Sequence, residues 1–330
     1  MLFITNRVFE EGPTPISSEG EALLPRAVRF NLQNNQAEQS VYLCRRNGSY
    51  DYTEIGSAAF FQELRNANAD QLLFFLHGFN TLPEQSLFQQ AQALQDLFTN
   101  HADTSVLVIP LIWPCDADEG IVDDYFDDQK AADASGFAYM RLIEKFFKWR
   151  ETNSTLEIPC TKHINILAHS MGNRVLRESL KLTHRYYQQG GLPLLFRNTF
   201  MVAADIVNES LEFGAEGQSI AESSRNVVTY FAADDLALRA SKVANVGNSI
   251  ASRRLGHSGP ERMEKTPHNV YAIDCNDFNT QYDRPTGHTY FMTNARREPG
   301  TVFQHIVQCI QTGRVPNSET GRRQHILTDD

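Results

Sequence analysis

The sequence predicts an α/β fold, in which a doubly wound, mostly parallel sheet carries helices on both faces. Short runs that are apolar throughout alternate with segments whose apolar residues have helical spacing. One of these runs stops at small residues around a serine and then turns helical, within residues 163–174. With 330 residues the chain can bury one large core, and we expect a single domain over 1–330.

Residues 1–70 are expected to open the sheet with antiparallel strands. Short apolar runs at 2–4, 28–32 and 41–44 are separated by polar, turn-rich stretches. A helix is predicted over 58–67.

Residues 71–295 are expected to form the central core. Apolar runs predict strands at 71–76, 105–112, from His163 onward, and at 199–204, 227–232 and 270–273. Helical spacing of apolar residues is found over 87–98. Repeated strand–helix–strand units imply parallel strands. Residues 296–330 are expected to form a helix, over 302–310, and a tail.

Composition disfavours several kinds of partner and compartment. The 40 acidic and 30 basic residues give a formal charge of −10, which disfavours nucleic acid. Five widely spaced cysteines without a C-x-x-C pair indicate neither a disulfide framework nor a metal site. The longest apolar run, 72–76, is too short to span a membrane, and the amino terminus does not resemble a signal peptide. We therefore expect a cytoplasmic protein.

Residues 168–172, Ala-His-Ser-Met-Gly, fit the small-x-Ser-x-Gly pattern of a nucleophile elbow. In such an elbow the serine, here Ser170, lies in a strained turn between strand and helix. The residues two before and two after it must be small, because strand and helix pass close together. The backbone N–H of Met171 would then point at an anion beside the hydroxyl. A serine that caps an ordinary strand–helix turn is the alternative for so short a match.

A second motif, His77-Gly78-Phe79-Asn80, closes an earlier buried strand. Gly78 would let the backbone turn so that the N–H of Phe79 faces the serine as a second oxyanion donor. His77 and Asn80 would support this loop rather than carry protons. A turn glycine after a buried strand is the alternative, but the two motifs in this order support each other.

An activated serine needs a base and an acid. In a fold with this order of strands, both follow the serine along the chain, the acid first and the histidine last. The downstream histidines are at positions 184, 257, 268, 288, 305 and 325. We select His288 as the base, because it lies in a glycine-containing loop after the last predicted core strand. Asp235, which follows the strand at 227–232, is selected as the acid. Asp234 beside it and Asp205, at the end of the previous strand, are the alternatives.

Together these motifs resemble an α/β-hydrolase family of unknown function that is found widely in bacteria. Its members carry an H-G-[FY]-N loop, an S-W-P strand end, an A-H-S-M-G-N elbow, an N-D-x-A-L acid motif and an H-x-Y-F histidine motif. The corresponding residues here are 77–80, 112–114, 168–173, 234–238 and 288–291. The resemblance implies Ser170, Asp235 and His288 as a catalytic triad. Ile112 stands where the family has serine, and Asp234 where it has asparagine.

Residues 115–133 contain eight acidic residues and a single lysine. Their spacing does not fit a calcium-binding loop. We expect a solvated loop near the mouth of the site.

The predicted site favours a serine hydrolase that cleaves an ester, thioester or related acyl bond of a small molecule. His288 would take the proton from Ser170, Asp235 would orient the imidazolium, and the N–H groups of Phe79 and Met171 would bind the oxyanion. This chemistry needs no metal and no organic cofactor. Acyl transfer to an acceptor other than water is one alternative, and a non-catalytic binding module on the same scaffold is another.

Overall fold

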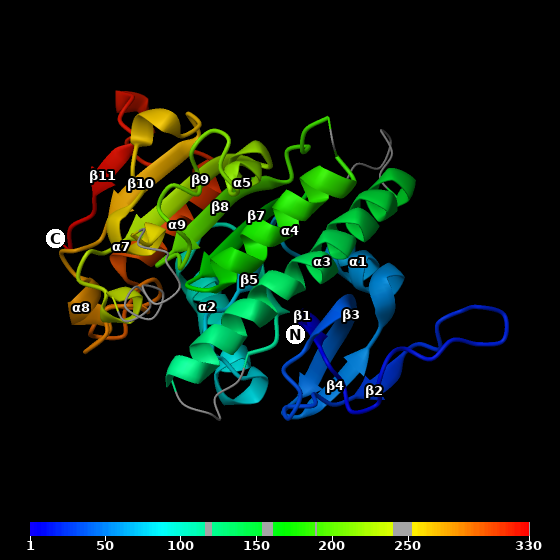
Figure 1. Ribbon diagram of the computed structural model, residues 1–330. Coiled ribbons are helices and arrows are strands. Elements are labelled where there is room, and N and C mark those ends of the chain that lie inside the picture. The colour runs from blue at the N-terminus through cyan, green and yellow to red at the C-terminus, as the bar shows by residue number, and fades with distance from the viewer. Residues whose placement is uncertain (116–120, 154–160, 189, 240–252, 330) are drawn as a thin grey trace.

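A computed structural model describes residues 1–115, 121–153, 161–188, 190–239 and 253–329. Within these residues the strands form one 11-stranded sheet in the order β11-β10-β9-β8-β7-β5-β6-β1-β3-β4-β2. Helices α3 and α4 lie side by side on one face of this sheet (Figure 1). The predicted α/β fold class is confirmed, including the mostly parallel sheet.

The elements have the following bounds. The strands are β1 Leu2–Arg7, β2 Arg26–Val28, β3 Ala37–Gly48, β4 Asp51–Glu54, β5 Gln71–Leu76, β6 Val106–Ile112, β7 His163–His169, β8 Phe196–Val202, β9 Ser224–Phe231, β10 Val270–Asp274 and β11 Gln324–Ile326. The helices are α1 Gly56–Asn66, α2 Phe88–His101, α3 Ile121–Asn153, α4 Gly172–Tyr186, α5 Gln218–Glu222, α7 Leu255–Ser258, α8 Asn279–Tyr282 and α9 Thr301–Thr312.

The amino-terminal strands form the antiparallel end of the sheet. The pairs β1–β3, β3–β4 and β2–β4 are antiparallel, as predicted, and β1 joins them to the core by a parallel pairing with β6. From β6 to β11 the neighbouring strands are parallel. Two short strands, β4 and β11, were not predicted; both are too polar to resemble buried strands.

The apolar strands are covered on both faces, which explains why they do not alternate with polar residues. In β5, Leu73 and Phe75 pack in the core that α2 and α9 complete. Leu72 and Leu76 pack in the opposite core, with residues of α1, α3 and α4. The sheet is therefore a rigid layer between two apolar cores.

The expectation of a solvated loop between Cys115 and Asp133 is wrong for its described part. Residues from Ile121 onward begin α3, a helix of 33 residues. Asp124 and Asp128 are buried, so this stretch is not simply solvated. Acidic residues are favourable in the first turns of a helix, where they face the positive end of its dipole. Residues 116–120 lie outside the described part of the chain.

Two further features concern the helices and the cysteines. In the described part of the chain, no helix combines the length and the apolar character needed to cross a bilayer. Cys44, Cys115, Cys275 and Cys309 are buried free thiols, and Cys160 lies outside the described residues.

The parallel strands bring the predicted motifs to one edge of the sheet. The motif 77–80 follows β5, Ser170 follows β7, Asp205 follows β8, and Asp234 and Asp235 follow β9. Since these strands run in one direction, their carboxyl ends meet at the same edge. The candidate site is therefore a set of loops on this edge.

Candidate functional site

Ser170 lies in a tight turn between β7 and α4, as the elbow motif predicts. Its φ of 50° is in the left-handed region, which a residue with a side chain seldom adopts. Its backbone N–H donates to the carbonyl of Val202 on the neighbouring strand at 2.9 Å. A Cβ atom at Gly172 would lie 2.6 Å from the carbonyl oxygen of His77, so only glycine fits there. Close packing of strand and helix thus fixes the position of Ser170.

Asn173 secures the turn from within α4. Its side-chain amide donates to the carbonyl oxygens of Ala168 at 2.9 Å and Ser170 at 3.0 Å. The strained φ of Ser170 is therefore held by hydrogen bonds from a buried side chain.

The loop at 77–80 contacts the elbow directly. A Cβ atom at Gly78 would lie 3.1 Å from Cβ of Ser170 and 2.9 Å from Nδ1 of His169. Absence of a side chain at Gly78 thus allows the loop backbone to approach the serine. Asn80 follows with a φ of 53°, and its N–H faces Asp128 of α3 at 3.4 Å. The structure brings together the two motifs that were predicted to act together.

His77 supports this loop and is fully buried. Its Nδ1 donates to the carbonyl of Gly78 at 2.8 Å, and its Nε2 accepts the backbone N–H of Trp113 at 3.2 Å. The Trp113 ring stacks on the imidazole, with 5.0 Å between the ring centroids. Burial lowers the pKa of His77 to about 4, so the ring is neutral at physiological pH.

His288 and Asp235 form a close pair. Nδ1 of His288 lies 2.7 Å from Oδ2 of Asp235, and the other carboxylate oxygen accepts the N–H of Leu238 at 3.0 Å. Burial alone would lower the pKa of His288, but the hydrogen bond and the charge of the buried Asp235 outweigh burial and raise it. The geometry suits a histidine that a carboxylate orients.

His169 brings the histidine loop to the elbow. Its Nε2 lies 3.3 Å from the carbonyl oxygen of His288, and the two ring centroids are 4.8 Å apart. Burial, assisted by the nearby His288, lowers the pKa of His169 to about 3. A neutral His169, at the end of β7, therefore contacts the His288 loop next to Ser170.

Asp283 holds the His288 loop and was not predicted. One of its oxygens accepts the backbone N–H groups of His288 and Thr289, each at 2.8 Å, and the hydroxyl of Thr286 at 2.7 Å. An aspartate a few residues before a Thr-Gly turn is a typical side-chain-to-backbone cap, and this local pattern could have identified it.

Asp234, the first alternative acid, binds the same loop from the other side. Its Oδ1 accepts the side-chain amide of Asn279 at 2.7 Å, and that amide also donates to the carbonyl of Gly287 at 3.0 Å. The two adjacent aspartates thus have different partners.

A family comparison fits this geometry. The model of a family described as "Alpha/beta hydrolase of unknown function" (DUF900) matches residues 55–301. The chain belongs to this family. The resemblance seen in the sequence is confirmed, and the matched span contains the elbow, the 77–80 loop, both aspartates after β9 and His288. No curated protein matches the chain.

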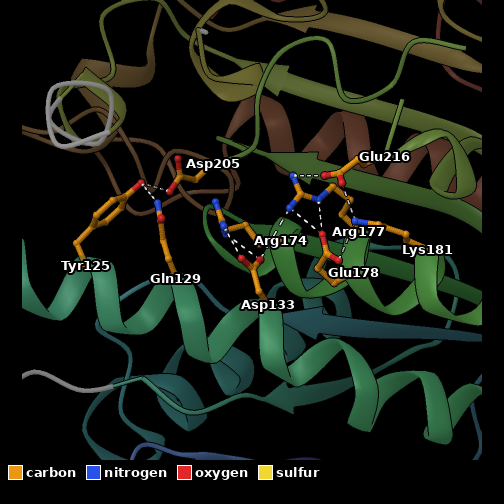
Figure 2. Close-up of polar contacts among 9 residues, drawn as sticks. All are labelled: Tyr125, Gln129, Asp133, Arg174, Arg177, Glu178, Lys181, Asp205 and Glu216. Carbon is orange, nitrogen blue, oxygen red and sulfur yellow. Dashed lines mark hydrogen bonds and ion pairs between the residues drawn. The ribbon is translucent and has the colours of Figure 1, made fainter. Parts of the chain in front are cut away.

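In this α/β hydrolase Asp205, the second alternative acid, is engaged on the α3 side of the elbow. Its carboxylate accepts the hydroxyl of Tyr125 at 2.7 Å and forms an ion pair with the buried Arg254 at 3.1 Å (Figure 2 shows the Tyr125 contact). Its backbone N–H donates to the carbonyl of Ser170 at 3.1 Å. Asp205 therefore connects the elbow to α3 and to the segment before α7.

An ionic network fixes α3 against the elbow helix α4 (Figure 2). Arg174 binds both oxygens of Asp133, at 3.1 and 2.6 Å. Further along α4, Arg177 lies 3.8 Å from Asp133 and 2.8 Å from Glu178 of its own helix, and Lys181 binds Glu216, before α5, at 2.6 Å. Since Tyr125 also packs edge-on against Phe79, with ring centroids 5.9 Å apart, α3 covers the 77–80 loop.

Among the residues described, no three or more His, Cys, Asp or Glu side chains are grouped so that they could hold a metal ion.

Proposed function

We propose that this protein is a serine hydrolase that cleaves an ester, thioester or related acyl bond of a small molecule through an acyl-enzyme. The observation that carries the proposal is the 2.7 Å contact between His288 and Asp235, on a loop that touches the residue before Ser170. A buried carboxylate bound to Nδ1 of a histidine is the arrangement that leaves Nε2 able to accept a proton.

In the proposed first step, Oγ of Ser170 attacks the acyl carbon and its proton passes to Nε2 of His288. Negative charge moves to the carbonyl oxygen, where the backbone N–H groups of Phe79 and Met171 would bind it. Asp235 stabilises the imidazolium that forms. The tetrahedral intermediate then collapses, the proton on His288 passes to the leaving alcohol or thiol, and the acyl group remains on Ser170.

In the second step water replaces the leaving group. His288 takes a proton from the water as its oxygen attacks the acyl-enzyme, and it returns the proton to Ser170 when the acid is released. Asp205 and Asp234 have no chemical part in this scheme. They hold the elbow and the histidine loop through the contacts with Arg254 and Asn279.

A panel of nitrophenyl esters of increasing acyl length tests this proposal. We expect turnover with at least one ester, preceded by a burst of nitrophenol that matches the enzyme concentration. Ser170→Ala should lower kcat by about a thousandfold or more, because the nucleophile is lost. Ser18→Ala, at an exposed serine, is the matched control and should be fully active.

Two results would count against the proposal. One is a folded wild-type protein that turns over none of the esters. The other is a Ser170→Ala variant that is as active as the wild type. Accumulation of acyl groups on an added alcohol, in place of free acid, would assign the same site to acyl transfer.

A further inference from the structure

A large cavity lies beneath α3, away from the predicted catalytic residues. Its volume is about 640 Å³, within the range of sites that bury a small molecule. Its walls are largely apolar and include Phe61 of α1, Phe74 of β5, and Phe146 and Trp149 of α3. None of the predicted catalytic or oxyanion residues is among the described residues that line it. Protein interiors are otherwise closely packed, so a cavity of this size is a candidate ligand-binding site.

Cationic side chains gather where the cavity reaches the amino edge of the sheet. Arg197 of β8 and Arg225 of β9 both line it. Arg197 and Arg225 lie opposite each other on neighbouring parallel strands. The residues before them, 196 and 224, are paired, and so are the residues after them, 198 and 226. Like charges at such positions repel each other. In a protein with a formal charge of −10, this pair is a local electropositive feature.

The guanidinium of Arg197 has an unsatisfied hydrogen-bond donor within the described part of the chain. Among the described residues its Nε is buried without a hydrogen-bond partner. Its guanidinium lies beside Gly313, where the chain leaves α9 at the amino edge of the sheet. Burial and the charge of Arg225 lower its pKa, which means that its charged form is poorly compensated.

Lys162 and His163 also lie at this end of the cavity. Burial and the charges of Arg197 and Arg225 lower the pKa of His163, at the start of β7, although Asp70 opposes them. Lys162, which also lines the cavity, binds the carbonyl oxygen of Ala67 at 2.6 Å. Lys162 is therefore a further cation at this end of the cavity, whereas the lowered pKa leaves His163 neutral at physiological pH.

We propose that this cavity binds a long-chain fatty acid, with the hydrocarbon chain against the apolar walls and the carboxylate at Arg197 and Arg225. Burial of the chain supplies the favourable transfer of apolar surface from water. Guanidinium groups bind carboxylates through paired, charge-assisted hydrogen bonds, and the carboxylate would relieve the repulsion between the two arginines.

The site is separate from the proposed hydrolase site. The cationic end of the cavity lies at the start of β7, at His163, whereas Ser170 follows the end of that strand; the apolar part of the cavity reaches Leu76, next to the 77–80 loop. Seven residues of extended chain separate His163 and Ser170 by roughly 20 Å. Fatty-acid binding therefore does not depend on whether Ser170 is catalytic.

Quenching of tryptophan fluorescence by a dibrominated stearic acid tests the proposal on the full chain. The sequence has two tryptophans, and Trp149 lines the cavity whereas Trp113 does not. We expect saturable quenching that Trp149→Phe largely removes. Ser170→Ala should leave the dissociation constant unchanged, since it alters only the other site.

The arginines are tested with the double variant Arg197→Gln/Arg225→Gln. The dissociation constant should rise about tenfold or more, because two charge-assisted contacts are lost. Arg296→Gln/Arg297→Gln removes the same charge at exposed positions and should bind as the wild type does. Arg225 is exposed, so Arg225→Gln alone serves if the double variant does not fold.

The methyl ester of the same acid is the ligand control and should bind at least several-fold more weakly. The proposal is overturned if wild-type protein shows no saturable quenching, or if the ester binds as tightly as the acid. It is overturned equally if the arginine variants keep wild-type affinity, or if Ser170→Ala abolishes quenching, which would place the ligand in the hydrolase site.

Discussion

Two adjacent aspartates after β9 point to different partners, as consecutive residues of an extended chain do. Asp235 contacts His288 and Asp234 contacts Asn279. We expect Asp235→Asn to lower kcat by up to about 10⁴-fold, because the amide no longer stabilises the imidazolium. Asp234→Asn should keep most of the activity. Ester hydrolysis by the two variants, with folding checked by circular dichroism, measures this difference.

One result would contradict the role of Asp235 as the acid. If Asp234→Asn or Asp205→Asn is the crippling change while Asp235→Asn is nearly silent, and all three proteins are equally folded, the role given to Asp235 is wrong. The elbow and the choice of Ser170 would not be affected.

The pH dependence follows from the raised pKa of His288. A general base must be neutral, so kcat/KM should rise with pH and reach half its maximum above the ordinary histidine value of about 6.5. Protonated His288 gains stability from Asp235, so this contribution to stability is complete below the unfolded-state pKa and is lost as pH rises through the folded-state pKa. Activity and this part of the stability should therefore change in opposite directions.

A pH–rate profile from pH 5 to 9 and a urea titration of the same protein measure the two trends. In Asp235→Asn the inflection of kcat/KM should move to lower pH. A flat profile with chemistry shown to be rate-limiting would remove His288 from the role of base.

Residue identity was predictable where a motif fixes local geometry, and less so elsewhere. The tight turn at Ser170 and the close contact at Gly172 could be predicted, because the elbow motif requires a small residue where strand and helix pass close together. Asp283 and Asn279 were missed because they act on the backbone of the His288 loop and not on a reacting atom.

The 77–80 loop and the elbow pack closely against each other at Gly78. A methyl group there would press on His169 and Cβ of Ser170. Gly78→Ala should therefore shift the loop and, on the proposed mechanism, lower kcat by about 10²- to 10³-fold, as loss of one oxyanion donor does. The kinetic constants for the best nitrophenyl ester measure this change.

Gly48→Ala is the matched control. A Cβ atom at Gly48 would meet nothing within 4 Å, and its backbone lies outside the positive-φ region. This variant should keep wild-type activity. Full activity of a folded Gly78→Ala would exclude a close fit between loop and elbow.

Helix α3 is the main element that the sequence interpretation missed. Its first turns are rich in acidic residues, which suggested solvent, whereas its second half has buried residues at helical spacing, including Ala138, Tyr139 and Leu142. That spacing was available in the sequence. The burial of Asp124 and Asp128 was not, because it depends on how α3 crosses the edge of the sheet.

Across the whole molecule, the contribution of an ion pair to the free energy of unfolding depends on how deeply the pair is buried. Asp205 and Arg254 are 3.1 Å apart and buried, whereas Glu10 and Arg29 are 3.0 Å apart and exposed. Asp205→Asn leaves a buried guanidinium without its counter-charge and should reduce the free energy of unfolding by about 3–5 kcal/mol. Glu10→Gln should change it by at most about 1 kcal/mol. Urea denaturation compares the two.

Equal destabilisation by both substitutions would contradict the structural role given to Asp205. The comparison also separates stability from chemistry. At temperatures well below its unfolding transition, Asp205→Asn should keep substantial ester turnover, unlike Asp235→Asn.

The arrangement of the strands in the core could be predicted from the sequence, whereas the pairing of charged residues across strands could not. Alternating apolar runs and helical spacing led to the parallel core, because burial on both faces leaves a local mark in the sequence. The cation pair of Arg197 and Arg225 left no such mark, since 28 positions separate the two residues and only the register of β8 and β9 aligns them.

Fluorophosphonate labelling with mass-spectrometric mapping tests whether Ser170 is an activated nucleophile. An organophosphorus reagent reacts rapidly only with a serine that a base activates beside an oxyanion site. We expect one adduct on native protein, at Ser170, with a rate that Asp235→Asn lowers and Asp234→Asn does not. Native protein that stays unlabelled, or a Ser170→Ala variant that is labelled to the same extent, would contradict this expectation.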